Sequence, residues 1–134
     1  MILDQIKAIA TDVRQWAESR AEGGYGEGDL CGWCAIASGE LFRKLQKAGI
    51  ESEIFLHESK SLGHAFVVTQ DYVVDVTATQ FHEFRDKTVI IMHLREAEAY
   101  LYYSSITRVF KDVDSFRRFQ KKNGWPTYQI AYNR

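Results

Sequence analysis

Apolar residues recur with the spacing of an amphipathic helix in two segments near the start of the chain. The first segment covers residues 3–20, with apolar positions at Leu3, Ile6, Ile9, Ala10, Val13 and Ala17. The second covers residues 34–48, with apolar positions at Cys34, Ala37, Leu41, Leu45 and Ala48. Gly49 is expected to end this second helix. Cys34 therefore belongs to the first turn of a predicted helix and faces the core with the other apolar positions.

After residue 50 the pattern changes to short runs of β-branched and aromatic residues, which indicate strands. We predict four strands, at residues 52–57, 64–69, 72–77 and 87–93. The dipeptide Gln70-Asp71 joins the middle two strands and is expected to form a hairpin turn. Two further helices are predicted, at residues 96–103 and 114–122. Helices followed by mostly antiparallel strands and then by helices indicate the α+β class.

Composition narrows the classes of protein to which this chain can belong. Its 134 residues suit a single domain over residues 1–134. Lysine plus arginine (17) nearly balance aspartate plus glutamate (18), and the net charge of −1 argues against nucleic-acid binding. The sequence has neither the roughly 18-residue apolar run of a membrane span nor the apolar region of a signal peptide. Two cysteines do not make a disulfide framework, so we expect a reducing, cytoplasmic compartment.

Cys34 and His64 have the properties of a nucleophile and its base. Residues 21–29, which are rich in glycine and acidic residues, are interpreted as a flexible loop that gives access to Cys34. The first turn of a helix presents the positive end of the helix dipole, which stabilises the reactive thiolate form of cysteine. His64 opens a predicted strand, and a histidine beside a thiolate acts as a general base. Each residue alone has a simpler interpretation, as a buried cysteine or a hydrogen-bonded strand-edge histidine.

Asp75 interrupts an otherwise apolar or β-branched run, where a carboxylate is costly unless it is paired. The two-residue turn sets three cross-strand pairs: Thr69 with Tyr72, Phe66 with Asp75, and His64 with Thr77. His64 and Asp75 then become diagonal neighbours on one face of the hairpin. A carboxylate in that position holds one imidazole nitrogen and orients the other toward a nucleophile. Cys34, His64 and Asp75 together predict a catalytic triad.

These residues resemble motifs of the papain-like and transglutaminase-like cysteine protease superfamily. The segment Cys31-Gly-Trp-Cys34-Ala-Ile-Ala-Ser38 resembles the nucleophile segment of papain-like enzymes, in which Cys-Gly-x-Cys precedes a helix. Gly63-His-Ala-Phe-Val67 resembles the histidine strand of the transglutaminase-like branch. Val74-Asp-Val-Thr77 resembles the aspartate strand of that branch, and the resemblance covers residues 28–82 in all.

The resemblance implies acyl transfer on amide or thioester bonds by Cys34, His64 and Asp75, without a metal or cofactor. It also implies a papain-like/transglutaminase-like core, with the nucleophile helix packed on a mostly antiparallel sheet. A hydrolase acting on a protein or peptide, such as a thiol protease or a glutamine deamidase, is the expected activity. Transglutaminases and N-acetyltransferases share the fold, so the fold does not determine the reaction.

The sequence identifies the hydrogen-bond donors of the oxyanion hole less clearly than it identifies the triad. Papain-like enzymes have a glutamine a few residues before the nucleophile, and Gly28 occupies that position here. The backbone N–H of Cys34 is one candidate donor, because the first N–H groups of a helix point at developing negative charge. The side chain of Trp33 or of Gln80 is the candidate for a second.

Three alternatives stay open. Cys31-Gly-Trp-Cys34 is also a C-x-x-C motif, which is typical of thiol redox proteins, although no predicted strand precedes it. Cys31, Cys34, His57 and His64 are residue types that bind zinc, at an unusual spacing. A catalytically silent binding or adaptor module is the third, with a basic stretch in residues 108–122 and aromatic residues from Tyr100 to Tyr132 as its partner surface.

Overall fold

A computed structural model describes residues 1–60 and 62–127, so Tyr128 and Tyr132 lie outside the described residues. The strands are β1 (Glu53–Glu58), β2 (Gly63–Thr69), β3 (Tyr72–Asp75), β4 (Ile90–His93) and β5 (Arg108–Phe110). The helices are α1 (Ile2–Ala21), α2 (Cys34–Lys47), α3 (Leu94–Ala97), α4 (Leu101–Ser104) and α5 (Val113–Asn123), with 3-10 turns η1 (Ala78–Gln80) and η2 (His82–Phe84). All strand pairs are antiparallel, in the order β4-β3-β2-β1-β5, which confirms the α+β class.

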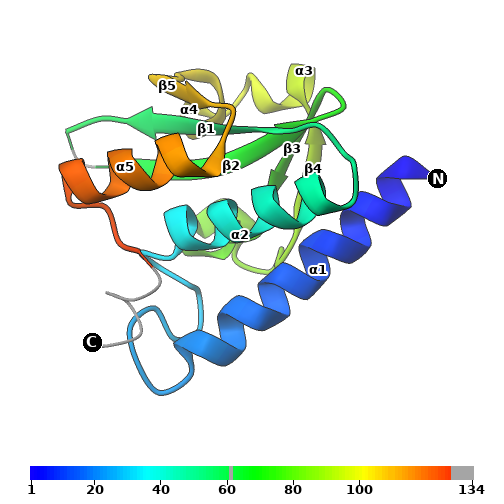
Figure 1. The fold of residues 1–134 in the computed structure, drawn as a ribbon. Coiled ribbons are helices and arrows are strands. Elements are labelled where there is room, and N and C mark those ends of the chain that lie inside the picture. The colour runs from blue at the N-terminus through cyan, green and yellow to red at the C-terminus, as the bar shows by residue number, and fades with distance from the viewer. Residues whose placement is uncertain (61, 128–134) are drawn as a thin grey trace.

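The sheet carries a different apolar layer on each face, and these two layers bury β2 on both sides. Ala65 and Val67 join the cluster formed with the apolar stripe of α2, and α1 and α5 flank α2 on this side (Figure 1). Phe66 and Val68 face the opposite way, into a cluster rich in aromatic residues. The short helices α3 and α4 contribute to that second cluster. No helix among residues 1–60 and 62–127 is long and apolar enough to cross a membrane.

The hairpin between β2 and β3 has the predicted register. Gln70 and Asp71 adopt positive φ angles of 54° and 65°, as a type I′ turn requires at both central positions. Thr69 pairs with Tyr72, and the next two pairs along the strands follow from it. The predicted helix start at Cys34 is also confirmed, and Gly49, at φ 77°, follows the end of α2.

The third and fourth strands are shorter than predicted. β3 ends at Asp75 rather than at residue 77, because the Asp75 carboxylate accepts the backbone N–H of Thr77 at 2.9 Å and turns the chain. β4 pairs residue for residue with β3 and therefore covers only Ile90–His93 instead of residues 87–93.

The predicted helix over residues 96–103 is wrong as a single element. It is replaced by α3 and α4, with Tyr100 in an extended conformation between them. In a continuous helix, Tyr102 would point away from the face that Tyr100 and Tyr103 share. The break instead lets all three rings contact Phe84. β5 was not predicted; three residues are too short for a pattern, and the strand exists only because it pairs with β1.

Part of the glycine-rich segment before Cys34, at Tyr25 and Gly26, packs against Trp33, which the interpretation as a flexible loop did not anticipate. Gly26 has a φ of 76°, and a Cβ atom there would collide with the indole of Trp33 and lie 2.9 Å from the carbonyl oxygen of Cys31. The indole N–H of Trp33 in turn donates to the carbonyl oxygen of Tyr25 at 2.7 Å. These contacts hold the residue directly before the helix that carries Cys34.

We therefore expect Gly26→Ala to lower the free energy of unfolding by about 1–3 kcal/mol, because it combines a positive φ with a collision against Trp33 and Cys31. Gly24→Ala is the matched control, since no atom lies within 4 Å of its added Cβ. Its effect in urea unfolding should stay within about 0.5 kcal/mol. Equal effects of the two substitutions would contradict this account of the segment.

Candidate active site

His64 and Asp75 form a buried pair at the centre of the site. His64 Nε2 donates to Asp75 Oδ2 at 2.6 Å, and the two side chains are 0% and 1% exposed. This is the diagonal contact that the hairpin register predicts. The pair lies on the sheet face opposite α2, where Phe66, Phe81 and Tyr103 place their rings around the imidazole.

Asp75 has a hydrogen-bond donor for each of its oxygen atoms. Oδ1 accepts the backbone N–H of Thr77 at 2.9 Å and its hydroxyl at 3.3 Å. Oδ2 accepts the hydroxyl of Tyr103 at 2.6 Å in addition to His64. Sequence reasoning missed Tyr103 as a site residue, because nothing in the pattern of α4 indicates which tyrosine reaches a carboxylate 28 positions earlier.

The electrostatics of the pair favour the ionised forms of both partners. Burial alone favours a neutral imidazole, but the charge of Asp75 and its hydrogen bond outweigh burial and raise the pKa of His64 from 6.5 to about 10. Burial likewise opposes ionisation of Asp75, yet His64, Tyr103 and Thr77 lower the pKa of its carboxyl below 3.8. Burial and the Asp75 charge raise the pKa of Tyr103, so its hydroxyl keeps its proton and donates.

Cys34 reaches this pair from the N-terminus of α2. It is the first residue of the helix and is 6% exposed. Its thiol interacts with the charge of His64 and is one of the causes that raise the pKa of the imidazole. The structure therefore brings the three predicted triad residues together. Because Nε2 of His64 is bonded to Asp75, Nδ1 is the nitrogen left for Cys34.

The two candidate oxyanion donors differ in their surroundings. The indole N–H of Trp33 is bonded to Tyr25 and its side chain is fully buried, so it is not available as a donor. The side-chain Nε2 of Gln80 donates to the carbonyl oxygen of Thr77 at 3.1 Å and lies 3.3 Å from Nδ1 of His64. Gln80 is half-buried. Its amide lies beside Nδ1 of His64, which is the nitrogen left for Cys34.

Arg14, which sequence reasoning also missed, ties the loop before Cys34 to the segment after Asp75. Its Nη1 donates to the carbonyl oxygen of Val76 at 2.9 Å and to the hydroxyl of Thr79 at 2.8 Å. Its Nη2 donates to the carbonyl oxygen of Gly28 at 3.3 Å. The Arg14 side chain is only 4% exposed and comes from α1, so one buried guanidinium links three parts of the chain that surround the triad.

The structure does not assemble the zinc ligands considered above. Among the residues described, no three histidine, cysteine or acidic side chains gather as a metal site. His57 directs Nδ1 to the carbonyl oxygen of Ser105 at 2.7 Å, and His64 is committed to Asp75. Cys31 is exposed and Cys34 buried, both as free thiols, and a loop rather than a strand precedes the C-x-x-C motif.

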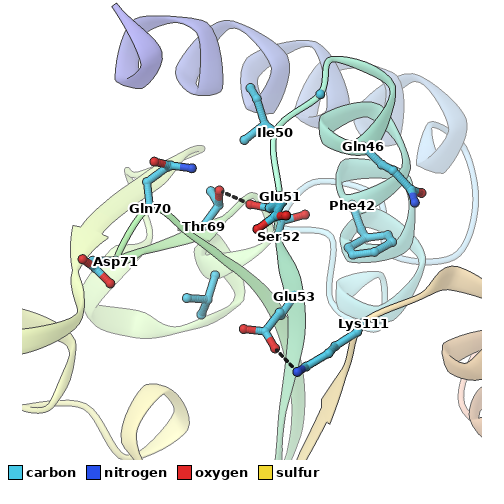
Figure 2. A pocket seen from close by; sticks show the side chains of 12 residues that line it. Phe42, Gln46, Ile50, Glu51, Ser52, Glu53, Thr69, Gln70, Asp71 and Lys111 are labelled. Carbon is cyan, nitrogen blue, oxygen red and sulfur yellow. Dashed lines mark hydrogen bonds and ion pairs between the residues drawn. The ribbon is translucent and has the colours of Figure 1, made fainter.

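A cavity of about 690 Å³ lies away from the triad, at the C-terminal end of α2 and beside the hairpin turn (Figure 2). Glu51, Glu53, Asp71 and Lys111 are among its lining residues, and Lys111 Nζ is 3.9 Å from Glu53 Oε2. A helix of 14 residues is about 20 Å long, so this cavity is not the substrate site of Cys34.

Comparisons of the chain with protein-family models, curated proteins and solved structures found no match. The geometry of the site therefore carries the functional argument.

Tyr103→Phe should lower the free energy of unfolding by about 1–3 kcal/mol at neutral pH, because it removes one donor from a buried carboxylate. The folded-state pKa of Asp75 lies below 3.8, so its contribution is complete above that pH and is lost as pH falls through the folded-state value. The difference between wild type and variant should therefore shrink in acid. Tyr100→Phe is the control, since its hydroxyl has no hydrogen bond among the described residues; a similar loss there would contradict the assignment.

The stability of the protein should also fall on the alkaline side because of His64. Its folded-state pKa of about 10 exceeds the ordinary 6.5, so its contribution is complete below 6.5 and is lost as pH rises through 10. Asp75→Asn removes the charge that causes this shift. We expect the difference in urea unfolding between wild type and Asp75→Asn to be largest near pH 6 and to shrink toward pH 10. A constant difference would show that the ring is not charged in the folded protein.

Proposed function

We propose that this chain is a cysteine-dependent acyl-transfer enzyme that hydrolyses an amide or thioester bond in a protein or peptide. The observation that carries the proposal is the buried hydrogen bond of 2.6 Å between His64 and Asp75, together with Cys34 at the start of α2, whose thiol contributes to the raised pKa of His64. A thiol, an imidazole and a carboxylate in this order are the parts needed for nucleophilic catalysis. A papain-like or transglutaminase-like fold is part of this proposal, and its support is the α2 helix packed on an antiparallel sheet.

The reaction proceeds in two halves. The Cys34 thiolate attacks the acyl carbon, a C–S bond forms, and the carbonyl π electrons move to the oxygen. The electrons return, the bond to the leaving amine or thiol breaks, and His64 gives that group its proton. Water then attacks the thioester while His64 takes a proton from it. The C–S bond breaks, which releases a carboxylic acid and restores the thiolate and the protonated imidazole.

Two hydrogen-bond donors are suited to stabilise the oxyanion that forms in each half of the reaction. The first N–H groups of a helix have no intrahelical acceptor, so the N–H of Cys34 points toward charge that develops beside its own sulfur. The Gln80 amide, which lies 3.3 Å from the catalytic nitrogen, is the second. Gln80 follows the aspartate strand, whereas the resemblance would place this glutamine at Gly28.

The burial of the triad favours one other function, a catalytically silent binding module. His64 and Asp75 have almost no exposed surface, and Cys34 exposes 6%. A substrate carbonyl has to reach Cys34 through that small opening. In the silent module, the same three residues serve only to complete the core, and Cys34 does not react.

The two functions differ in the reactivity of Cys34. We expect iodoacetamide to alkylate Cys34 faster than Cys31 at neutral pH, because the positive charge of His64 activates the thiol. His64→Ala should remove that reactivity, because it removes the positive partner of the thiolate. Mass spectrometry resolves alkylation at Cys34 from alkylation at Cys31. The small thioester S-phenyl thioacetate should in turn leave an acetyl group on Cys34.

Cys31→Ser is the matched control. Acyl transfer requires Cys34 alone, so this variant should keep the reactivity at Cys34 unchanged, whereas a C-x-x-C redox centre would lose function with either cysteine. Inert Cys34 beside an ordinarily reactive Cys31 would favour the silent module. Equal reactivity of Cys34 in wild type and in His64→Ala would show that the imidazole does not activate the thiol.

A further inference from the structure

The acyl-transfer chemistry proposed above uses Cys34 but not Cys31, which lies three positions earlier in the chain. The two thiols have different surroundings. Cys34 is 6% exposed and interacts with the charge of His64, whereas Cys31 is exposed. The backbone N–H of Cys31 donates to Asp29 Oδ1 at 2.9 Å. One short segment therefore carries a shielded thiol beside a positive charge and an accessible thiol beside a carboxylate.

The chain turns tightly between the two cysteines. The carbonyl oxygen of Leu30 accepts the N–H of Trp33 at 2.9 Å, which places Cys31 and Gly32 at the centre of a turn. Gly32 has a φ of 85°, as the second central position of a type II turn requires. Trp33 follows with φ −96° and ψ 0°, and α2 begins directly after it at Cys34. An extended chain separates residues three positions apart by about 10 Å, whereas this turn favours the ~4.4–6.8 Å that a disulfide spans between Cα atoms.

The two residues between the cysteines are held by Tyr25. A Cβ atom on Gly32 would collide with the hydroxyl of Tyr25, and the carbonyl oxygen of Tyr25 accepts the indole N–H of Trp33 at 2.7 Å. Trp33 is fully buried. A turn that is already formed reduces the conformational entropy lost when a disulfide closes across it. The folded chain is therefore suited to join Cys31 and Cys34.

We propose that Cys31 is a resolving cysteine, which forms a reversible disulfide with Cys34 when a hydroperoxide oxidises the protein. The disulfide takes the sulfur of Cys34 out of use as a nucleophile and prevents its further, irreversible oxidation to a sulfinic acid. That this stops acyl transfer until the bond is reduced rests on the proposed function. The pairing of the two cysteines does not.

The oxidation has two steps, written here for hydrogen peroxide. The Cys34 thiolate attacks one peroxide oxygen, an S–O bond forms, the O–O bond breaks, and the departing hydroxide takes a proton from His64 to give water. The Cys31 sulfur then attacks the sulfur of the Cys34 sulfenic acid, an S–S bond forms, and the S–O bond breaks. The second hydroxide leaves with the proton of the Cys31 thiol as water. Two electrons pass from the two cysteines to the peroxide, and a dithiol returns them when it reduces the disulfide.

The first test treats the full chain with a small excess of hydrogen peroxide and follows the intact mass and the peptide masses. The wild-type mass should fall by two hydrogen atoms, and dithiothreitol should restore both thiols. In Cys31→Ser, Cys34 should instead gain oxygen atoms. After dithiothreitol, this variant should have lost at least about fivefold more of its Cys34 thiol than the wild type has.

A second variant tests whether the position of the accessible thiol matters. Asp4→Cys combined with Cys31→Ser keeps two cysteines but moves the exposed one roughly 25 Å along α1, away from the loop before Cys34 (Figure 1). This variant should lose Cys34 irreversibly, as Cys31→Ser does. Protection equal to that of the wild type would overturn the proposal, and so would equal irreversible loss in the wild type and Cys31→Ser.

A third measurement separates this proposal from the catalytic one. The chain is equilibrated with mixtures of reduced and oxidised glutathione, so the result depends on the stability of the disulfide and not on the reactivity of Cys34. In the wild type the internal disulfide should exceed the glutathione adducts at least about tenfold, because the second thiol is held close by. Cys31→Ser should give only an adduct at Cys34.

The internal disulfide in a protein whose Cys34 shows no enhanced alkylation would support the pairing and contradict the catalytic proposal. Rapid alkylation of Cys34 with glutathione adducts in place of the internal disulfide would do the reverse. A disulfide that forms only after the chain is unfolded in urea would also overturn the proposal, because the pairing would then not be a property of the folded turn.

Discussion

The buried carboxylate of Asp75 is the group on which the rest of the site depends. A carboxylate that is 1% exposed is costly unless each oxygen is hydrogen-bonded, and its donors come from three different parts of the chain. His64 on β2, Tyr103 on α4 and Thr77 after β3 all bond to it. The same bonds end the third strand and fix the position of α4, so the geometry of the site and the path of the chain have one cause.

The charge state of the site follows from this arrangement. Asp75 keeps its charge because His64, Tyr103 and Thr77 stabilise it, and that charge in turn keeps the imidazole protonated. Aromatic rings surround the imidazole and exclude water, which strengthens the electrostatic interactions between the buried groups. A thiol at the start of α2 then faces a fixed positive charge, which is the condition that the proposed chemistry requires.

The helix α2 positions the proposed nucleophile. Its apolar stripe anchors Cys34 against the core, and Phe116 of α5 packs over Gly39 on another side of the helix. Arg14 holds the loop that leads into this helix to the segment that follows Asp75. The position of Cys34 is therefore determined from both sides, by the core contacts of α2 and by the loop in front of it.

The sequence by itself determined the features that depend on neighbouring residues. Helical periodicity located α1 and α2, and the Gln70-Asp71 turn set the register that makes His64 and Asp75 neighbours. Only the tertiary structure decided which side chains meet across long separations. Tyr103 reaches Asp75 across 28 positions, Arg14 reaches Thr79 across 65, and β5 exists because β1 offers it an edge. The physical reason is that periodicity reports which face of an element is buried, whereas the partner of a buried polar group depends on how all the elements pack together.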